Sequence, residues 1–66
     1  MIKKYSPMNK LKTKRLNAGM TQTELAKIIG VDNQTIYFYE SGYRFPRKDI
    51  LLKLAEALEC TVSDIL

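Results

Sequence analysis

Two side-chain amides and two aromatic rings fall within one short stretch, at Asn33, Gln34, Tyr37 and Phe38. An amide carries a donor and an acceptor in one plane, so it can pair bidentately with N6 and N7 of adenine, and a ring can lie against a thymine methyl group. On a helix these four positions point to one side. We therefore expect a helix that presents them for reading base pairs. The rings of Tyr37 and Phe38 could instead pack on a neighbouring loop or a partner subunit.

The helix that carries these four residues is expected to run from about Asn33 to Glu40. Ile36 and Tyr39, three residues apart, would face the core, and Ser41 would point outward with the polar positions. A merely solvated face would usually carry Lys and Glu. The amides at the start of the helix are therefore the more specific signal of base reading.

A first helix precedes it and is expected to begin at Gln22. Thr21 and Glu24 form a Thr-x-x-Glu capping box, in which each side chain satisfies a backbone N–H. The predicted inner positions of this helix are Leu25, Ala26, Ile28 and Ile29. Gly30 would close it in the left-handed conformation, Val31 would turn inward, and the Asp32 side chain would cap the next helix. Two short helices joined by such a tight turn form a helix-turn-helix, whose second helix enters the major groove of DNA.

The chain resembles the Cro/cI-type (Xre-type) helix-turn-helix family of bacterial and phage repressors from Met8 to Leu66. The matching run consists of Arg15, GMTQTELA, IIGVDNQTI, YESG, ILLKLAEAL and TVSDIL. The resemblance implies an all-α fold, a compact bundle of about five short helices with the helix-turn-helix at the second and third, as in lambda repressor.

The resemblance also implies roles for individual residues. Gln22 would contact a DNA phosphate or a base, and sequence reading would fall to Asn33, Gln34, Thr35 and Phe38. Arg15 and Glu40 would form a partly buried ion pair. The residues themselves support this pair, because Arg15 lies in an otherwise apolar stripe and an unpaired buried charge is costly.

The loop YRFPR after the second motif helix supplies candidates for contact with the DNA backbone. Arg44 and Arg47 are well placed for phosphates that flank the groove. Tyr43 and Phe45 could alternatively form a dimer interface, where aromatic residues are enriched. Tyr37 joins the base-reading set, and the full set of predicted backbone contacts is Thr21, Gln22, Thr23, Ser41, Tyr43, Arg44 and Arg47.

Residues 1–6 are expected to form an N-terminal arm, and residues 7–66 the DNA-binding domain. Ser6 followed by Pro7 predicts an N-cap and first helical position. Lys3 and Lys4 could contact phosphate or a groove, although such tails are more often mobile. The first helix of the domain would run to about Ala18, with an inner stripe of Met8, Leu11, Arg15 and Ala18.

A helix from about Lys48 to Glu59 should follow the loop. Its buried positions are predicted to be Leu51, Leu54, Ala55 and Leu58, which leaves Ile50 or Leu52 partly outside. Thr61 and Asp64 resemble a second capping box, for a last turn from Val62 to Leu66, in which Ile65 and Leu66 would cover this helix or a symmetry mate. Glu59 stands where relatives commonly have glycine, and Cys60 is interpreted as a core residue.

Composition narrows the classes of function. The 66 residues carry a net charge of +4, contain no histidine and have one cysteine, so we expect one domain with a polyanionic partner, no internal disulfide and no metal or other cofactor. No signal peptide or membrane-spanning run is visible, no small-molecule ligand is implied, and the cytoplasm is the expected compartment. An enzyme is disfavoured, because no acid pair or phosphate-binding glycine loop is present.

The function predicted from all these features is sequence-specific binding of double-stranded DNA. The simplest form is a repressor that occupies a palindromic operator as a homodimer, with residues 33–40 in the major groove. The alternative is an antitoxin-like or other protein-interaction module that also binds its own promoter.

Overall fold

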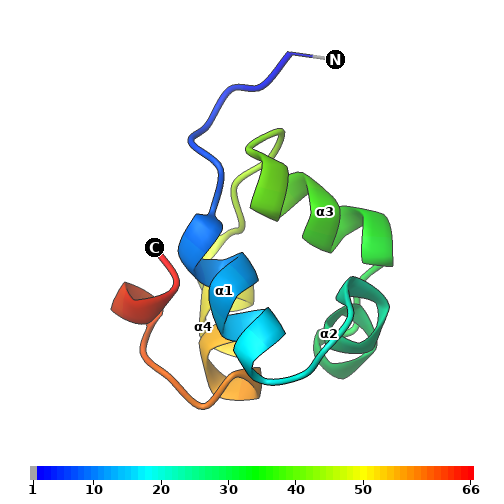
Figure 1. The fold of residues 1–66 in the computed structure, drawn as a ribbon. Coiled ribbons are helices and arrows are strands. Elements are labelled where there is room, and N and C mark those ends of the chain that lie inside the picture. Colours follow the sequence, from blue (N-terminus) through cyan, green and yellow to red (C-terminus); the bar gives the residue numbers. More distant parts are fainter. Residues whose placement is uncertain (1) are drawn as a thin grey trace.

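The computed structural model describes residues 2–66, which form four α-helices and one 3-10 turn and contain no strand. The helices are α1 (Asn9–Asn17), α2 (Gln22–Ile29), α3 (Asn33–Ser41) and α4 (Lys48–Ala57), and the 3-10 turn is η1 (Val62–Asp64). Figure 1 shows α3 at one end of the bundle, with α1, α2 and α4 grouped beneath it. The predicted all-α fold is confirmed. Its fifth element is a short 3-10 turn and not a full helix.

Helix α2 begins where its capping box predicts. The Thr21 hydroxyl accepts the Glu24 N–H at 3.1 Å, and the Glu24 carboxylate accepts the Thr21 N–H at 2.9 Å. The Thr21 backbone N–H, and then the Thr21 side chain, hold the pKa of the Glu24 carboxyl below its usual value. A lowered pKa means that the folded state favours the ionised carboxyl. This contribution is present above the unfolded-state pKa and is lost as the pH falls through the lower pKa of the folded state.

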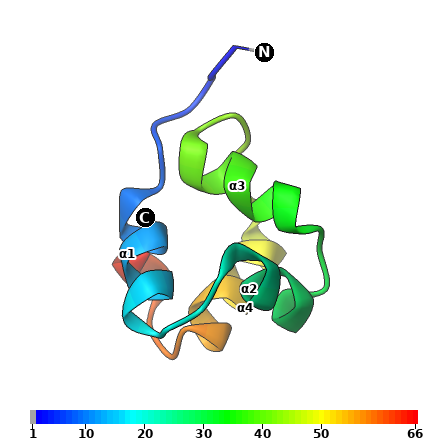
Figure 2. The same cartoon turned by 45° about the vertical axis from the view of Figure 1, so that its right-hand side comes forward.

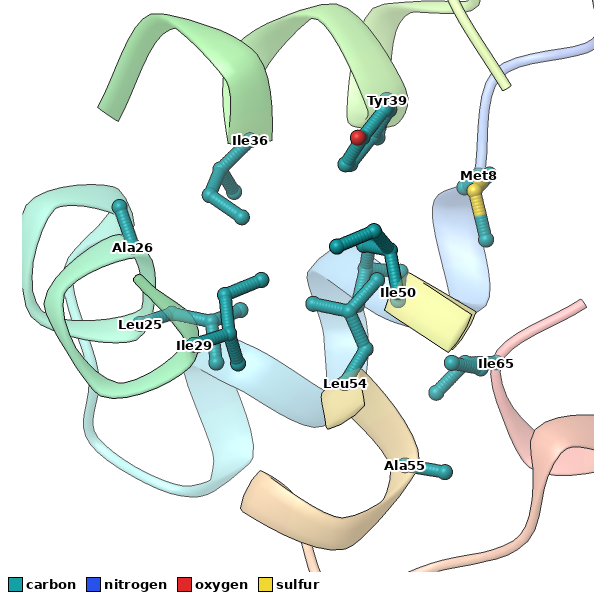
Figure 3. Packing of buried hydrophobic residues seen from close by; sticks show 11 residues of the cluster. Met8, Leu25, Ala26, Ile29, Ile36, Tyr39, Ile50, Leu54, Ala55 and Ile65 are labelled. Atoms are coloured by element: carbon teal, nitrogen blue, oxygen red, sulfur yellow. The ribbon is translucent and has the colours of Figure 1, made fainter. Parts of the chain in front are cut away.

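The core fills the space between α3 and the other helices. Figure 3 shows Ile36 and Tyr39 pointing down from α3, Ile36 toward Ile29 of α2 and Tyr39 toward Ile50 of α4. The hydrophobic core consists of Met8, Leu11, Leu25, Ala26, Ile29, Ile36, Tyr39, Ile50, Leu54, Ala55 and Ile65. Ile65, which follows η1, is fully buried and closes the core at the C-terminal end of the described chain. The predicted inward positions of α3 are therefore correct.

Five predicted core positions are wrong or only partly right. Ile28 is 58% exposed, because α2 packs against both α3 and α4 and its buried side is centred on Leu25, Ala26 and Ile29. Ala18 is exposed, since it caps the end of α1 and no later turn covers it. In α4 the residue left outside is Leu52, whereas Ile50 is buried and Leu51 and Leu58 are half-buried at the edge of the core. Cys60 is also half-buried against the core.

The start of α1 differs from the prediction. Ser6 and Pro7 do not cap the helix, which begins at Asn9 after Met8 and has no side-chain cap. The backbone N–H of Tyr5 instead donates to the carbonyl of Gly42 at 3.0 Å, so the chain runs along the loop after α3 before it turns into α1. A proline restricts the residue before it to extended conformations. The Ser6-Pro7 pair therefore continues the arm here.

Helix α4 ends two residues earlier than predicted, and Glu59 takes the left-handed conformation after it, with φ 53°. The Cys60 N–H donates to the Ala55 carbonyl at 2.9 Å, which is the hydrogen bond of a Schellman C-cap. Glycine normally fills this left-handed position because a side chain makes it strained. Glu59 is thus a locally unfavourable residue in a required conformation.

Glu59→Gly is expected to raise the free energy of unfolding by about 0.5–1 kcal/mol, because glycine adopts this conformation without strain. Thermal or urea unfolding measures the change. Gly30→Ala is the matched control. Gly30 has φ 79° and no atoms within reach of an added Cβ, so only backbone strain is introduced and stability should fall. An equal or lower stability of Glu59→Gly would contradict the assignment of strain to this residue.

Candidate nucleic-acid interface

The turn between α2 and α3 sets the direction of the candidate reading helix. Gly30 closes α2 with φ 79°, and the N–H groups of Gly30 and Val31 both donate to the Ala26 carbonyl at 2.9 Å. Val31 is half-buried against the core, as predicted. Asp32 is the N-cap of α3, but its side chain accepts no capping hydrogen bond, so that part of the prediction is wrong. The Thr35 N–H instead donates to the Asp32 carbonyl at 3.0 Å.

A buried ion pair fixes α3 against α1. The Nε of Arg15 lies 2.7 Å from Oε2 of Glu40, and its Nη2 donates to Oε1 of Glu40 at 3.1 Å. The two side chains are only 7% and 4% exposed. The remaining Nη1 of Arg15 donates to the Met20 carbonyl at 2.7 Å. Every buried side-chain nitrogen and oxygen in residues 2–66 has a hydrogen-bond partner, which is the condition for a buried charge pair to be tolerated.

Gln22 joins this network from the first residue of α2. Its Nε2 donates to Oε1 of Glu40 at 3.1 Å, so one carboxylate connects three helices. The amide is half-buried and keeps a second N–H that this bond does not use. The family resemblance implies a DNA contact for Gln22, and nothing in the sequence indicates this link, which spans 18 positions of the chain. A phosphate contact would use the second N–H.

The predicted base-reading residues divide into two groups. Asn33 and Gln34 are both exposed, in the first turn of α3. Thr35 is half-buried, and Tyr37 is 45% exposed. Asn33, Gln34 and Tyr37 are therefore the exposed members of the predicted base-reading set, and Thr35 and Phe38 are its half-buried members.

Phe38 is less free than predicted. Its ring is half-buried, lies edge-on to Tyr43 with centroids 5.9 Å apart, and is covered by the Arg44 guanidinium 5.0 Å from the ring centroid. Tyr37 also approaches Tyr43, at 6.3 Å between centroids. The alternative of packing against a neighbouring loop thus describes both rings, since Tyr43 lies in the loop between α3 and α4.

The predicted backbone-contact residues lie at both ends of the helix pair. Thr21 and Thr23 are exposed at the start of α2, and the Thr21 hydroxyl is engaged in the capping box. Ser41 and Tyr43 are half-buried, whereas the Arg44 and Arg47 side chains are exposed. The guanidinium of Arg47 lies 3.7 Å from Asp49 in an exposed pair, which competes only weakly with a phosphate.

Tyr5 is a residue that the sequence patterns do not single out. Its backbone N–H is bonded to Gly42, and its ring lies 5.9 Å from that of Phe45. Lys3 lies over the ring of Tyr43 at 5.6 Å. No sequence signal pairs residues that are about forty positions apart, because a lone tyrosine in a polar tail has no periodicity. The arm and the α3–α4 loop nevertheless form one surface.

Other kinds of site are not found in the described part of the chain. Residues 2–66 contain no group of three or more His, Cys, Asp or Glu side chains placed to hold a metal ion. None of the helices in this range is long and apolar enough to span a bilayer.

Comparison with known proteins identifies the family. A helix-turn-helix family model matches residues 11–65. An uncharacterised HTH-type transcriptional regulator of Archaeoglobus fulgidus is 39% identical over 51 residues, which are 77% of this chain and 73% of that protein. Among solved structures, the restriction-modification controller protein C.AhdI of Aeromonas hydrophila aligns with a TM-score of 0.82 at 29% identity, over 88% of each chain.

The clp gene regulator ClgR of Corynebacterium glutamicum aligns with a TM-score of 0.81 at 26% identity. The alignment covers 86% of this chain, which spans only 61% of the ClgR chain. Family model, relative and structures agree, and the chain belongs to the Xre/Cro-type helix-turn-helix family of DNA-binding transcriptional regulators.

Proposed function

We propose that this protein is a sequence-specific repressor that occupies a palindromic operator as a homodimer, with α3 of each subunit in the major groove. The observation that carries the proposal is the exposed amide pair Asn33 and Gln34, on a helix held rigidly by the buried Arg15–Glu40 pair. Amides at this end of a recognition helix can pair with adenine edges. The family supports DNA binding, and the operator form and repression are the proposed extensions.

The proposed contacts are of two kinds, to base edges and to phosphates. Base edges would be read by Asn33 and Gln34, with Thr35, Tyr37 and Phe38 completing the complementary surface. Phosphates would be held at one end by Thr21, Gln22 and Thr23, and at the other by Ser41, Tyr43, Arg44 and Arg47. These backbone contacts set the register of α3, and residues 7–66 make up the proposed DNA-binding domain.

Dimerisation follows from the size of the reading surface. One recognition helix covers a few base pairs, so useful affinity requires two half-sites about one helical turn apart. Leu66 and Phe45 are 53% and 44% exposed and offer apolar surface for pairing, whereas Pro46 is buried and contributes none. The proposed action is occupancy of DNA without catalysis, in the cytoplasm where the chromosome lies.

Selection of bound duplexes from a random pool is the experiment that tests this function. We expect a palindromic consensus with two half-sites, and two protein chains per selected duplex in sedimentation. A consensus with a single half-site and one bound chain would refute the dimer. A pool that shows no enrichment would refute sequence-specific binding and favour a protein partner for this domain.

A further inference from the structure

An open groove lies between the N-terminal arm (residues 2–6) and the loop after α3. It has a volume of about 840 Å³ and is lined by Ile2, Lys4, Tyr5, Tyr43, Arg44 and Phe45. Figure 1 and Figure 2, which differ by a turn of 45°, both show the arm passing beside this loop at the C-terminal end of α3. The groove is therefore built from two segments that are distant in sequence.

The backbone of the arm meets that of the loop at Tyr5 and Gly42. Besides the 3.0 Å hydrogen bond from Tyr5 to Gly42, the arm passes so close to Gly42 that a Cβ there would overlap the Tyr5 carbonyl oxygen and lie 3.2 Å from the Pro7 nitrogen. Gly42 also has φ 92°, which favours glycine. Gly19 and Gly30 are left-handed as well but have open space around them. Gly42 is thus the glycine that both turns the chain and admits the arm.

The walls of the groove suit an anion with a partly apolar body. Lys4 and Arg44 supply positive charge from opposite segments, and the lining contains no acidic residue. In residues 2–66 the ion pairs are Arg15–Glu40 and Arg47–Asp49, so neither of the two cations is neutralised by one. The phenols of Tyr5 and Tyr43 are donors of the kind that bind phosphate oxygens.

The groove is continuous with the reading side of α3. Tyr43, in its wall, contacts the rings of Tyr37 and Phe38, and Arg44 covers Phe38. Lys3 lies over the other end of this aromatic row, 5.6 Å from the Tyr43 ring centroid. With α3 in the major groove, the backbone of the DNA strand at the edge of that groove would lie next to these side chains.

We infer that this groove binds the sugar-phosphate backbone of one DNA strand next to the major groove that α3 occupies. Lys4 and Arg44 contact phosphates from its two walls, and the tyrosine phenols donate to the same oxygens. The arm is then part of the DNA-binding surface of this protein. The inference rests on the proposed DNA binding and assigns to it a segment that precedes the helical bundle.

Lys4→Gln tests the inference, because it removes one charge from an exposed side chain without disturbing the core. Binding is measured on the selected duplex and on a random duplex of equal length, at several salt concentrations. Removal of one phosphate contact lowers the slope of log K against log salt by about 0.9, which corresponds to about fivefold weaker binding at 0.15 M salt if affinity at 1 M is unchanged. The reduction should be the same on both duplexes, since a phosphate contact carries no sequence information.

Lys53→Gln is the matched control, because Lys53 is an exposed lysine on α4 beside Ile28 and Ala57, away from the groove. Its effect reports the change in net charge alone. Tyr5→Ala removes the ring that faces Phe45. Like Lys4→Gln, it should weaken binding to both the selected and the random duplex.

Three results would refute the binding of the DNA backbone in this groove while leaving the proposed DNA binding of the protein intact. They are a Lys4→Gln variant equal to Lys53→Gln in affinity and slope, a weakening confined to the selected duplex, and a shift in the monomer–dimer equilibrium of the free protein with an unchanged salt slope. The last would mean that a second copy occupies the groove. Failure of the wild-type protein to bind any duplex would instead end the proposed function itself.

Discussion

Glu40→Ala is expected to lower the free energy of unfolding by about 3 kcal/mol. The Arg15 side chain is 7% exposed, and the substitution removes both its carboxylate partner and the acceptor of the Gln22 amide. A buried charge that loses its partner costs far more than the pair contributes to stability, because its desolvation is no longer offset. Denaturant unfolding measures the change, and a decrease below about 1 kcal/mol would mean that the pair is not buried.

Two further variants separate this effect from a simple change in packing. Asp49→Ala breaks the exposed pair with Arg47 and should cost less than about 1 kcal/mol, because solvent screens it. The double replacement Arg15→Met with Glu40→Met removes both charges. It should be less destabilising than Glu40→Ala alone, since no charge is left buried. A double variant as unstable as the single one would assign the effect to packing and not to the uncompensated charge.

Gln34→Ala is expected to weaken binding to the selected duplex by about 1–3 kcal/mol, or roughly 5- to 150-fold, with little effect on random DNA. Gln34 is exposed at the first turn of α3. In the proposed complex it would pair bidentately with one base in each half-site. The preference at that base should relax in a repeated selection. The measurement is binding of wild type and variant to both duplexes at one salt concentration.

Arg44→Ala provides the contrasting behaviour. It should weaken binding to both duplexes and lower the slope of log K against log salt by about 0.9, because the variant neutralises one phosphate fewer. Asn17→Ala is the control for Gln34, because Asn17 is an exposed amide at the end of α1, outside the reading side. If Gln34→Ala weakens specific and random DNA alike, α3 lies differently in the groove and its outward side is wrongly assigned.

Features that depend on neighbouring residues were predicted well from the sequence. The capping boxes at Thr21 and Thr61 formed with the predicted partners, and Gly30 took the left-handed conformation that ends α2. The Arg15–Glu40 pair spans 25 positions, and it could be predicted because a charged residue in an apolar stripe demands a partner and the family resemblance supplied one.

Features set by distant contacts were predicted poorly. Ser6 and Pro7 carry a genuine helix-start signal, but the Tyr5–Gly42 hydrogen bond holds this stretch in the arm. Ile28 fits the helical period of the α2 stripe, yet which side of α2 is covered depends on how α4 approaches it. For Phe38 the sequence leaves two alternatives open, base reading and packing on a neighbouring loop, because the folding of the α3–α4 loop over its ring is not encoded in the local pattern. The base and phosphate contacts remain predictions.

The position of Arg15 has a consequence for protein engineering. The helix pair of residues 21–42 contains Glu40 and Gln22 but not the arginine, which comes from α1. A graft of this segment onto another scaffold would therefore carry a buried carboxylate without its cation, and the angle between its helices would lose its main polar constraint. Exchange of the exposed residues Asn33 and Gln34 disturbs none of these bonds. New DNA specificity is thus better introduced by changing those side chains in place than by transplanting the motif.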